Sequence, residues 1–275
     1  MSDDQHPLTE APARKALGQH FLFDPSILKR AANAAGSPNG RTVIEVGPGP
    51  GGLTRAILNE SPARLIAVET DPRFSEALLD WPEAKSGQLI VIAKDARKVR
   101  WEKALEEAGA TGPAMIIANL PYNVGTPLLV DWLKAEGWRG EMALMFQKEV
   151  AERICAKPDT DAYGRLAVLA QAVTRPYISF TLPPGAFRPP PKVDSAVAVF
   201  EPLPPEKRFA HIDLLEQIAG AAFGQRRKML RSSLKTLGGE ALCEKAGVDP
   251  NARAEVIDGA GFMRLAAALQ PTGGA

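Results

Sequence analysis

The chain has 275 residues, of which 45 % are hydrophobic, and its 33 basic residues nearly balance its 32 acidic ones. This length and composition suit a folded protein with one large domain, or with a large and a small one. No run of about 18 apolar residues is present, the polar N-terminus lacks the apolar core of a signal peptide, and the two cysteines are far apart, so we expect a cytoplasmic protein without membrane spans, a disulfide framework or a zinc site.

The first part of the chain predicts alternating strands and helices. Residues 1–14 are polar and rich in turn formers, so we expect a flexible N-terminal tail. From residue 41 onward, short apolar runs alternate with longer amphipathic segments, a rhythm that is typical of a mostly parallel sheet. The expected strands are 43–46, 65–68, 89–92, 115–118 and 142–146, and the expected helices between them include 52–60, 72–80 and 126–136.

The pattern changes in the last hundred residues. Residues 177–182 and 196–200 alternate like two late strands, and the proline-rich stretch 183–191 separates them. Sheet edges tolerate proline, so we expect an antiparallel pair at the edge. Residues 206–275 show helical periodicity only. The sequence therefore predicts a doubly wound α/β domain over 15–203 and a small helical domain over 204–275.

A glycine-rich segment follows the first expected strand, with Glu45 before it and Gly47 and Gly49 inside it. Glycine lets the backbone approach a ligand closely, and the N–H groups at the start of the next helix attract polar atoms. Glu69 ends the second strand, where a carboxylate can accept hydrogen bonds from both hydroxyls of a ribose. Asp95 follows the third strand and suits an adenine amine. The segment therefore predicts a site for a nucleoside-containing cofactor.

The glycine pattern by itself leaves two cofactors open. Gly47, Gly49 and Gly52 also satisfy the dinucleotide-binding pattern of nicotinamide dehydrogenases, with Glu69 as the ribose acid. However, the two prolines of the loop remove N–H donors that a pyrophosphate requires, and Glu45 would repel a phosphate. A sulfonium with an amino-acid tail fits such a site better, so S-adenosylmethionine is favoured. A glycine turn without a ligand is the remaining alternative.

Asn119, Leu120, Pro121 and Tyr122 follow the fourth strand, at the sheet edge where parallel sheets bind ligands. Adenine N6 is a poor nucleophile because its lone pair is delocalised into the ring. The Asn119 side-chain oxygen and a neighbouring backbone carbonyl can each accept one N6–H, which directs the lone pair toward a methyl donor. Pro121 fixes this backbone, and Tyr122 can stack on the base. A plain turn before a helix is the alternative.

Two further features suggest contacts with a nucleic acid. Phe187 stands among prolines and is interpreted as a second clamp on the base, opposite Tyr122, with packing beneath the loop as the alternative. Residues 225–235 carry five cations and no acid. Such a patch binds phosphates with a strong dependence on salt, although a solvated helix face has the same composition. The cations interpreted as RNA contacts are Arg226, Arg227, Lys228 and Arg231.

Six segments in combination resemble the ribosomal RNA adenine dimethylases, specifically the bacterial small-subunit type called KsgA or RsmA. The resemblance extends from Lys15 to about Leu265. The segments that carry it are Leu17 to Leu22, Glu45 to Gly49, Asn119 to Tyr122, Tyr163 to Leu166, Phe187 to Val197 and Phe223 to Lys228.

The resemblance implies a class I S-adenosylmethionine-dependent methyltransferase: a Rossmann-like domain with a seven-stranded, mostly parallel sheet and a small C-terminal helical domain. It implies that no metal is needed and that the partner is 16S rRNA in the 30S subunit or its precursor, where two adjacent adenosines in the 3′-terminal hairpin receive four methyl groups. A monomer is the default expectation. The residues that the resemblance places around the cofactor are Gln19, His20, Leu22, Glu45, Gly47, Gly49, Glu69, Asp95 and Asn119.

Two alternatives within this resemblance stay open. The Erm enzymes methylate large-subunit rRNA, but they usually carry isoleucine where this chain has Leu120, and they generally lack the stretch at 187–197. A ribosome assembly factor without catalytic activity is the other alternative. The intact segment from Asn119 to Tyr122 argues against it.

Overall fold

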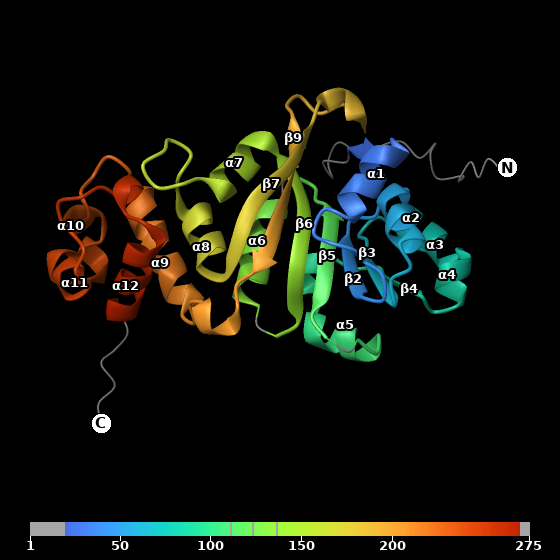
Figure 1. Cartoon of the computed structure of the whole chain (residues 1–275), viewed down its shortest axis with the longest axis horizontal. Coiled ribbons are helices and arrows are strands. Elements are labelled where there is room, and N and C mark those ends of the chain that lie inside the picture. Colours follow the sequence, from blue (N-terminus) through green and yellow to red (C-terminus); the bar gives the residue numbers. More distant parts are fainter. Residues whose placement is uncertain (1–19, 111, 123, 136, 270–275) are drawn as a thin grey trace. The chain divides into compact units, whose positions relative to one another are not determined.

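The computed structural model, which describes residues 20–269 except 111, 123 and 136, contains a seven-stranded sheet (Figure 1). Its strand order is β4-β3-β2-β5-β6-β9-β7, and a separate two-stranded sheet pairs β1 with β8. The predicted α/β fold with a mostly parallel sheet is therefore confirmed, as are the five early strands and the two late strands. The strands are β1 (Phe21–Leu22), β2 (Thr42–Val46), β3 (Arg64–Val68), β4 (Leu89–Ile92), β5 (Ala114–Asn119), β6 (Arg139–Gln147), β7 (Thr174–Leu182), β8 (Phe187–Arg188) and β9 (Ser195–Pro202).

The helices connect these strands and complete the C-terminal part of the chain. The α-helices are α1 (Pro25–Ala32), α2 (Gly52–Asn59), α3 (Pro72–Leu79), α4 (Pro82–Lys85), α5 (Trp101–Glu107), α6 (Gly125–Lys134), α7 (Lys148–Cys155), α8 (Arg165–Val173), α9 (Ile212–Gly224), α10 (Leu230–Ser233), α11 (Gly239–Lys245) and α12 (Gly259–Leu269). Short 3-10 helices are η3 (Ala96–Lys98), η4 (Pro184–Ala186), η5 (Pro205–Lys207), η6 (Lys235–Leu237) and η7 (Ala254–Val256). In the described residues, no helix is both long and apolar enough to cross a membrane.

The parallel strands are buried on both faces, which explains their nearly continuous apolar sequences. β2 lies between β3 and β5, so that Val43 is opposite both Leu65 and Met115. Val43 and its neighbour Ile44 point to opposite faces of the sheet, and both side chains are fully buried. β9 runs antiparallel to β6 and lies beside β7, which occupies the edge.

Aspartates cap the N-termini of two helices, α1 and α3. Asp24 accepts hydrogen bonds from the backbone N–H groups of Ser26 and Ile27 at the start of α1, and Asp71 accepts one from Arg73 at the start of α3. In both helices proline is the first residue, where its missing N–H costs nothing. These caps fix where each helix begins and therefore where the preceding turn lies.

The chain divides into two compact units. The first comprises the described residues up to Lys148 together with Ile178–Glu201, and the second comprises Glu149–Tyr177 and the described residues from Pro202 onward. The last change from one unit to the other, between Glu201 and Pro202, lies close to the predicted domain boundary at 203/204. The segment 149–177 differs from the prediction, because α8 packs against α9 and α12 rather than belonging with the sheet.

The second unit has a core of its own. The aromatic ring of Phe223 contacts both Tyr163 and Phe262, with ring centroids 5.7 and 5.3 Å apart. The apolar face predicted for the segment that forms α9 is confirmed as buried; its members are Ile212, Leu215, Ile218, Ala219 and Ala222. The predicted N-terminal tail, residues 1–14, lies outside the described residues.

Candidate functional site

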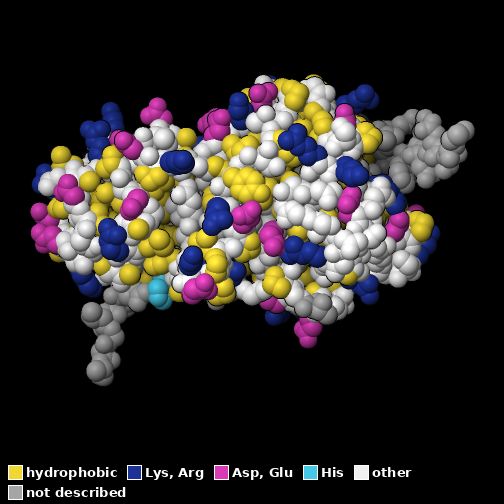
Figure 2. All heavy atoms as spheres, viewed as in Figure 1, with side chains coloured by type: hydrophobic (Ala, Val, Ile, Leu, Met, Phe, Trp, Pro, Cys, Tyr) yellow, Lys and Arg dark blue, Asp and Glu magenta, His cyan; other side chains and the backbone are white. Residues whose placement is uncertain are grey.

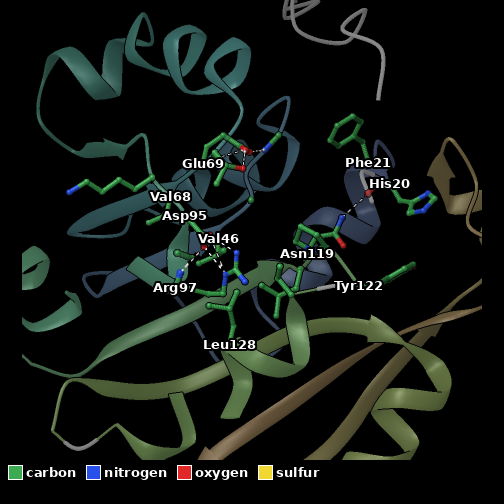
Figure 3. Close-up of a pocket in the computed structure, with 18 residues that line it drawn as sticks. His20, Phe21, Val46, Val68, Glu69, Asp95, Arg97, Asn119, Tyr122 and Leu128 are labelled. Atoms are coloured by element: carbon green, nitrogen blue, oxygen red, sulfur yellow. Dashed lines mark hydrogen bonds and ion pairs between the residues drawn. The ribbon is translucent and has the colours of Figure 1, made fainter. Parts of the chain in front are cut away.

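A cavity of about 260 Å³ opens where β2, β3, β4 and β5 end at their C-terminal edge. This is the edge at which open α/β sheets bind ligands. Figure 3 shows that Glu69, Asp95 and Arg97 project from one side of the cavity, whereas His20, Asn119 and Tyr122 lie on the other. The residues that line it are His20, Phe21, Val46, Gly47, Gly49, Val68, Glu69, Thr70, Lys94, Asp95, Ala96, Arg97, Asn119, Leu120, Pro121, Tyr122, Val124 and Leu128.

The glycine loop forms one wall of this cavity and uses its own N–H groups internally. Gly47, Gly49 and Gly51 have φ angles of +72°, +53° and +88°, a region that favours glycine. Their N–H groups donate to the carbonyl of Val68, to the carboxylate of Glu69 and to the carbonyl of Pro48, at 2.9 to 3.0 Å. The loop therefore brings backbone close to a ligand without offering these donors to a pyrophosphate.

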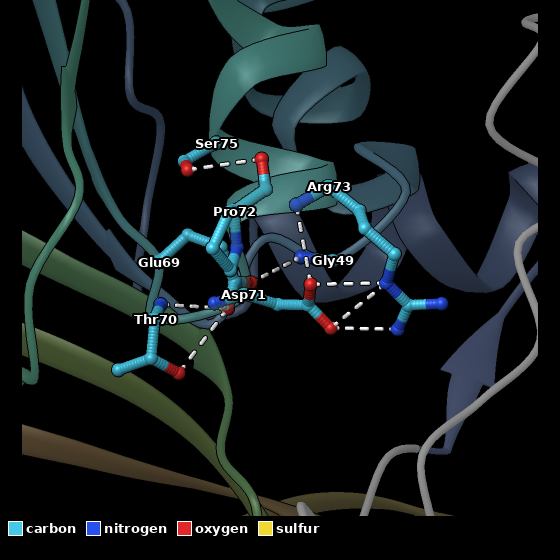
Figure 4. Close-up of polar contacts among 7 residues, drawn as sticks. All are labelled: Gly49, Glu69, Thr70, Asp71, Pro72, Arg73 and Ser75. Carbon is cyan, nitrogen blue, oxygen red and sulfur yellow. Dashed lines mark hydrogen bonds and ion pairs between the residues drawn. The ribbon is translucent and has the colours of Figure 1, made fainter.

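Glu69 joins the end of β3 to this loop (Figure 4). One carboxylate oxygen accepts from the Gly49 N–H at 3.0 Å, and the other accepts from the N–H groups of Thr70 and Asp71, both at 2.8 Å. Burial raises the pKa of Glu69, and the three backbone hydrogen bonds oppose that rise. The side chain is 5 % exposed and lines the cavity, so its unused lone pairs can accept from a vicinal diol.

Asp95 also lines the cavity and lies three residues after the end of β4. As the N-cap of η3 it accepts from the backbone N–H of Arg97, and its two oxygens accept from the Arg97 guanidinium at 2.6 to 3.2 Å. These hydrogen bonds, chiefly the side-chain one, hold the pKa of Asp95 below its usual value. Asp95 is therefore held in its carboxylate form, which can accept a hydrogen bond from an adenine amine.

Asn119 and Tyr122 are held by hydrogen bonds to distant parts of the chain. The Asn119 side-chain N–H donates to the backbone carbonyl of His20 at 2.9 Å. Because only the amide nitrogen can donate to a carbonyl, the Asn119 side-chain oxygen is left for the cavity. The Tyr122 hydroxyl and the Ser195 hydroxyl lie 2.8 Å apart in a hydrogen bond, and burial raises the pKa of Tyr122. Leu120 and Pro121, between them, also line the cavity.

His20 covers one face of Tyr122. The two rings stack with their centroids 5.5 Å apart and an interplanar angle of 29°. The His20 Nδ1 atom lies 2.8 Å from the carbonyl oxygen of Pro189, in hydrogen-bond contact. His20 thus connects the catalytic candidate Asn119, through its own carbonyl, with the proline loop, through its ring.

Phe187, which was predicted to clamp the base opposite Tyr122, does not line the main cavity. Its ring is 2 % exposed and belongs to the hydrophobic core, because β8 pairs antiparallel with β1 and sets Phe187 opposite Leu22. The packing alternative therefore describes Phe187 in this structure. His20 is the aromatic side chain that lies on Tyr122.

Two predicted cofactor residues, Leu22 and Glu45, do not line the main cavity. The Leu22 side chain is 5 % exposed and packs in the core. Glu45 is 1 % exposed and borders a smaller cavity of about 20 Å³, which shares Phe21, Gly47 and Asn119 with the main one. Burial is the main cause that raises the pKa of Glu45, to about 8. Gln19 lies outside the described residues.

Sequence reasoning missed several residues that shape the site. Phe21 packs so closely on the loop that a Cβ atom at Gly49 would lie 2.6 Å from its ring. Arg97 and Ser195 hold Asp95 and Tyr122. The spacing of Asp95 and Arg97, two residues apart at the start of a helix, is a signal that predicts the first pair. The contacts of Phe21 with the glycine loop and of Ser195 with Tyr122 join residues far apart in sequence, so no local pattern predicts them.

The predicted basic patch is divided in the structure. Arg226 donates to the backbone carbonyls of Asp161 and Tyr163, both at 3.0 Å, so it holds a loop of its own unit. Arg227, Lys228 and Arg231 are exposed and make no ion pair with another residue in the part of the chain that the structure describes. The face drawn in Figure 2 shows cations and acids interspersed rather than one continuous basic surface.

Comparison with known proteins gives consistent results. A family model described as "Ribosomal RNA adenine dimethylase" matches residues 11–270. The chain is 54 % identical over 256 residues to the "Ribosomal RNA small subunit methyltransferase A" of Caulobacter vibrioides, covering 93 % of this chain and 97 % of the relative. The protein with the same description from Phenylobacterium zucineum is 52 % identical over 254 residues, covering 92 % of this chain and 87 % of the relative.

Solved structures support the fold. A dimethyladenosine transferase from Plasmodium falciparum superimposes with a TM-score of 0.72 at 23 % identity, covering 90 % of this chain and 96 % of the other. The 23S rRNA methyltransferase ErmE superimposes with a TM-score of 0.63, also at 23 % identity, covering 90 % of this chain and 99 % of the other. At this level of identity the two structures show a common fold and no more.

Proposed function

The chain belongs to the ribosomal RNA adenine dimethylase family, and from this premise we propose that it dimethylates the N6 amines of two adjacent adenosines in 16S rRNA, with S-adenosylmethionine as methyl donor. The substrate is the 3′-terminal hairpin within the 30S subunit or its precursor, so the enzyme acts in small-subunit biogenesis. The names of its relatives support the small-subunit assignment.

One observation carries the proposal. A single cavity brings two carboxylates suited to an adenosine, Glu69 and Asp95, together with an amide oxygen and a phenol suited to a second adenine, Asn119 and Tyr122. Methyl transfer between a nucleoside cofactor and a base requires these two sets of groups side by side. A protein that only binds ribosomal particles has no need of the combination.

The residues of the cavity fit S-adenosylmethionine, whose contribution when bound is an electrophilic methyl group on a sulfonium. Glu69 would accept from both ribose hydroxyls, and Asp95 from the adenine amine. Gly47 and Gly49 would let the backbone pass close to the amino-acid tail. The Glu45 carboxyl, buried and without a hydrogen-bond partner among the described residues, matches a ligand of positive charge.

Asn119 would orient the substrate nitrogen. Its side-chain oxygen accepts one N6–H, and a neighbouring backbone carbonyl accepts the other, which turns the nitrogen lone pair out of the ring plane and toward the methyl donor. Tyr122 stacks on the target base, a contact worth about 1–3 kcal/mol per base in other proteins. No strong base is needed, because the methylated nitrogen loses its proton readily. The protein's contribution is position and electrostatic support.

The dehydrogenase alternative fails on the same loop. A pyrophosphate is held by free backbone N–H groups. Here the N–H groups of Gly47, Gly49 and Gly51 are already in hydrogen bonds, and prolines occupy the two positions between them. S-adenosylhomocysteine should therefore raise the melting temperature of the protein, and NAD should not.

The helical unit would supply part of the contact with the ribosomal particle. Arg227, Lys228 and Arg231 are the cations suited to this task, since they are exposed and unpaired among the described residues. Each phosphate contact releases counterions and makes binding dependent on salt. We further propose that the protein acts as a monomer in the cytoplasm and requires no metal.

The experiment that tests the proposal is transfer of labelled methyl groups from S-adenosylmethionine to 30S and 50S subunits that lack the modification. Label in 30S RNA alone, recovered as N6,N6-dimethyladenosine, is the expected result. Label confined to 50S RNA would move the protein to an Erm-like activity. Tight binding to 30S subunits without label would favour the assembly-factor alternative.

A further inference from the structure

The ring of His20 occupies a stacking position on Tyr122. The two rings have their centroids 5.5 Å apart and their planes 29° apart. Carbon atoms in van der Waals contact are about 3.5–4.0 Å apart, so a base between the two rings would need a separation of about 7–8 Å. The free protein therefore has no room for a base on this face of Tyr122.

The position of Asn119 indicates that the target base needs this same face. The Asn119 side-chain amide donates to the backbone carbonyl of His20 at 2.9 Å, so residue 20 borders the amide whose oxygen is to accept the N6 amine. Figure 3 shows His20, Asn119 and Tyr122 together on one side of the cavity. A base that reaches the Asn119 oxygen and stacks on Tyr122 must therefore enter the space beside His20.

The His20 ring is held by fewer contacts than the His20 backbone. Among the described residues, the ring makes one hydrogen bond, between Nδ1 and the carbonyl oxygen of Pro189 at 2.8 Å. The backbone carbonyl of His20 accepts from Asn119, and the next residue, Phe21, pairs with β8. Rotation about the side-chain bonds of His20 therefore removes the ring from Tyr122 while Asn119 keeps its hydrogen bond.

We propose that the His20 ring occupies the place of the target adenine in the free protein and that the incoming base displaces it. The inference rests on the proposed function, since it concerns the same base and the same methyl transfer. The displaced ring gives up its stack on Tyr122 and its hydrogen bond to Pro189, whereas the His20 carbonyl continues to hold Asn119. His20 thus competes with the base for Tyr122.

The strengths of the two stacking contacts allow the base to displace the ring. A pair of aromatic side chains contributes about 2- to 13-fold to an equilibrium constant. Stacking of a nucleic-acid base on an aromatic side chain contributes about 5- to 150-fold. The gain from stacking the base therefore exceeds the loss of the His20 contact, and that loss lowers the apparent affinity of the base for its position.

Substitutions at His20 test this competition, because all of them keep the backbone carbonyl that holds Asn119. His20→Ala removes the competing ring, and His20→Trp replaces it with a larger ring that stacks more strongly. The quantity to measure is kcat/KM for methylation of 30S subunits at saturating S-adenosylmethionine. We expect His20→Ala to raise kcat/KM about 2- to 13-fold and His20→Trp to lower it.

A purely structural role of His20 would give a different pattern, since both substitutions would then lower kcat/KM. His211→Ala is the matched control, because it removes another histidine ring from an aromatic contact, with Phe209 at a centroid distance of 6.0 Å. This control should leave kcat/KM unchanged. Melting curves identify a variant that fails to fold, and His20→Asn then replaces His20→Ala as the variant without an aromatic ring.

The order of the three kcat/KM values decides the outcome. Any order other than alanine above histidine above tryptophan at position 20, including three equal values, would overturn the inference and leave the proposed function intact. Absence of methylation by the unmodified protein would overturn the proposed function itself, and this inference with it.

Discussion

The carboxylate of Glu69 accepts a hydrogen bond from the backbone N–H of Gly49 at 3.0 Å, across twenty residues of sequence. One side chain at the end of β3 thereby holds the glycine loop after β2, and the same carboxylate faces the cavity. Its position is fixed before any ligand arrives. A substitution at Glu69 should thus affect both the loop and the binding of a ribose.

Replacing Glu69 with glutamine keeps the size of the side chain and removes one acceptor oxygen. We expect the affinity for S-adenosylhomocysteine to fall about 10- to 100-fold, because hydrogen bonds to charged groups contribute about 1.5–3 kcal/mol. Calorimetry measures the change. Glu76→Gln, at an exposed position of α3, is the matched control and should bind like the unmodified protein. Equal affinity of the two variants would remove Glu69 from the site.

A substitution at Gly49 should act through a steric conflict, because it changes no charge. Alanine there places a Cβ atom 2.6 Å from the Phe21 ring at a φ of +53°, so the ring or the loop must shift. We expect weaker binding of S-adenosylhomocysteine and a lower melting temperature. Gly185→Ala, where a Cβ meets nothing within 4 Å, should change neither. A Gly49→Ala protein that binds normally would show that the loop and Phe21 move freely.

The hydrogen bond between Tyr122 and Ser195 predicts a change in turnover rather than in cofactor binding. Ser195→Ala leaves the Tyr122 hydroxyl without its partner, so the ring is free to leave the stacking position. We expect a lower kcat for methylation of 30S subunits and an unchanged Kd for S-adenosylhomocysteine. Tyr122→Phe combined with Ser195→Ala should cost no more than either change alone, since both remove the same bond. Fully additive effects would contradict this coupling.

The free protein should lose stability as the pH rises. Burial raises the pKa of Glu45 in the folded state to about 8, above the ordinary value of 4.5. The folded state therefore holds this proton more tightly, and the resulting stabilisation is complete below pH 4.5 and is lost as the pH rises through 8. Thermal melting between pH 5 and 8.5 measures the trend. Glu45→Gln should flatten it, and an unchanged slope in that variant would assign the titration to another group.

The basic residues of the helical unit should separate into two classes. Charge reversal at Arg227, Lys228 and Arg231 should weaken binding to 30S particles and flatten its salt dependence, without changing the melting temperature. Arg226→Ala should instead lower the melting temperature, because its guanidinium holds two backbone carbonyls. Sedimentation binding at several salt concentrations, with melting curves beside it, distinguishes the classes. Unchanged particle affinity after charge reversal would return the patch to a solvated helix face.

The sequence was informative wherever chemistry is local. Buried parallel strands appear as continuous apolar runs, so β2 to β6 could be predicted, and carboxyl ends of parallel strands meet at one edge, so Glu69, Asp95 and Asn119 could be placed together. The apolar face of the helix over residues 212–222 could be predicted in the same way, from its helical spacing.

The sequence did not predict the positions of side chains that depend on contacts between residues far apart in the chain. Phe187 is buried because β8 pairs with β1, a register that no local pattern contains. The same pairing sets the Leu22 side chain into the core. Arg226 belongs to a cationic run, but its guanidinium donates to two backbone carbonyls that lie more than sixty residues away in sequence. Charge alone cannot tell such a structural cation from one that meets a phosphate.

The most direct test of the account compares the unmodified protein with Asn119→Ala on 30S subunits that lack the modification. Nucleoside analysis measures the product, and cosedimentation measures particle binding. The account predicts N6,N6-dimethyladenosine with the unmodified protein and a rate at least about 100-fold lower with the variant, the scale of losing one positioned hydrogen bond in a transition state, while particle binding persists. Methylation by Asn119→Ala at a rate close to that of the unmodified protein would contradict it.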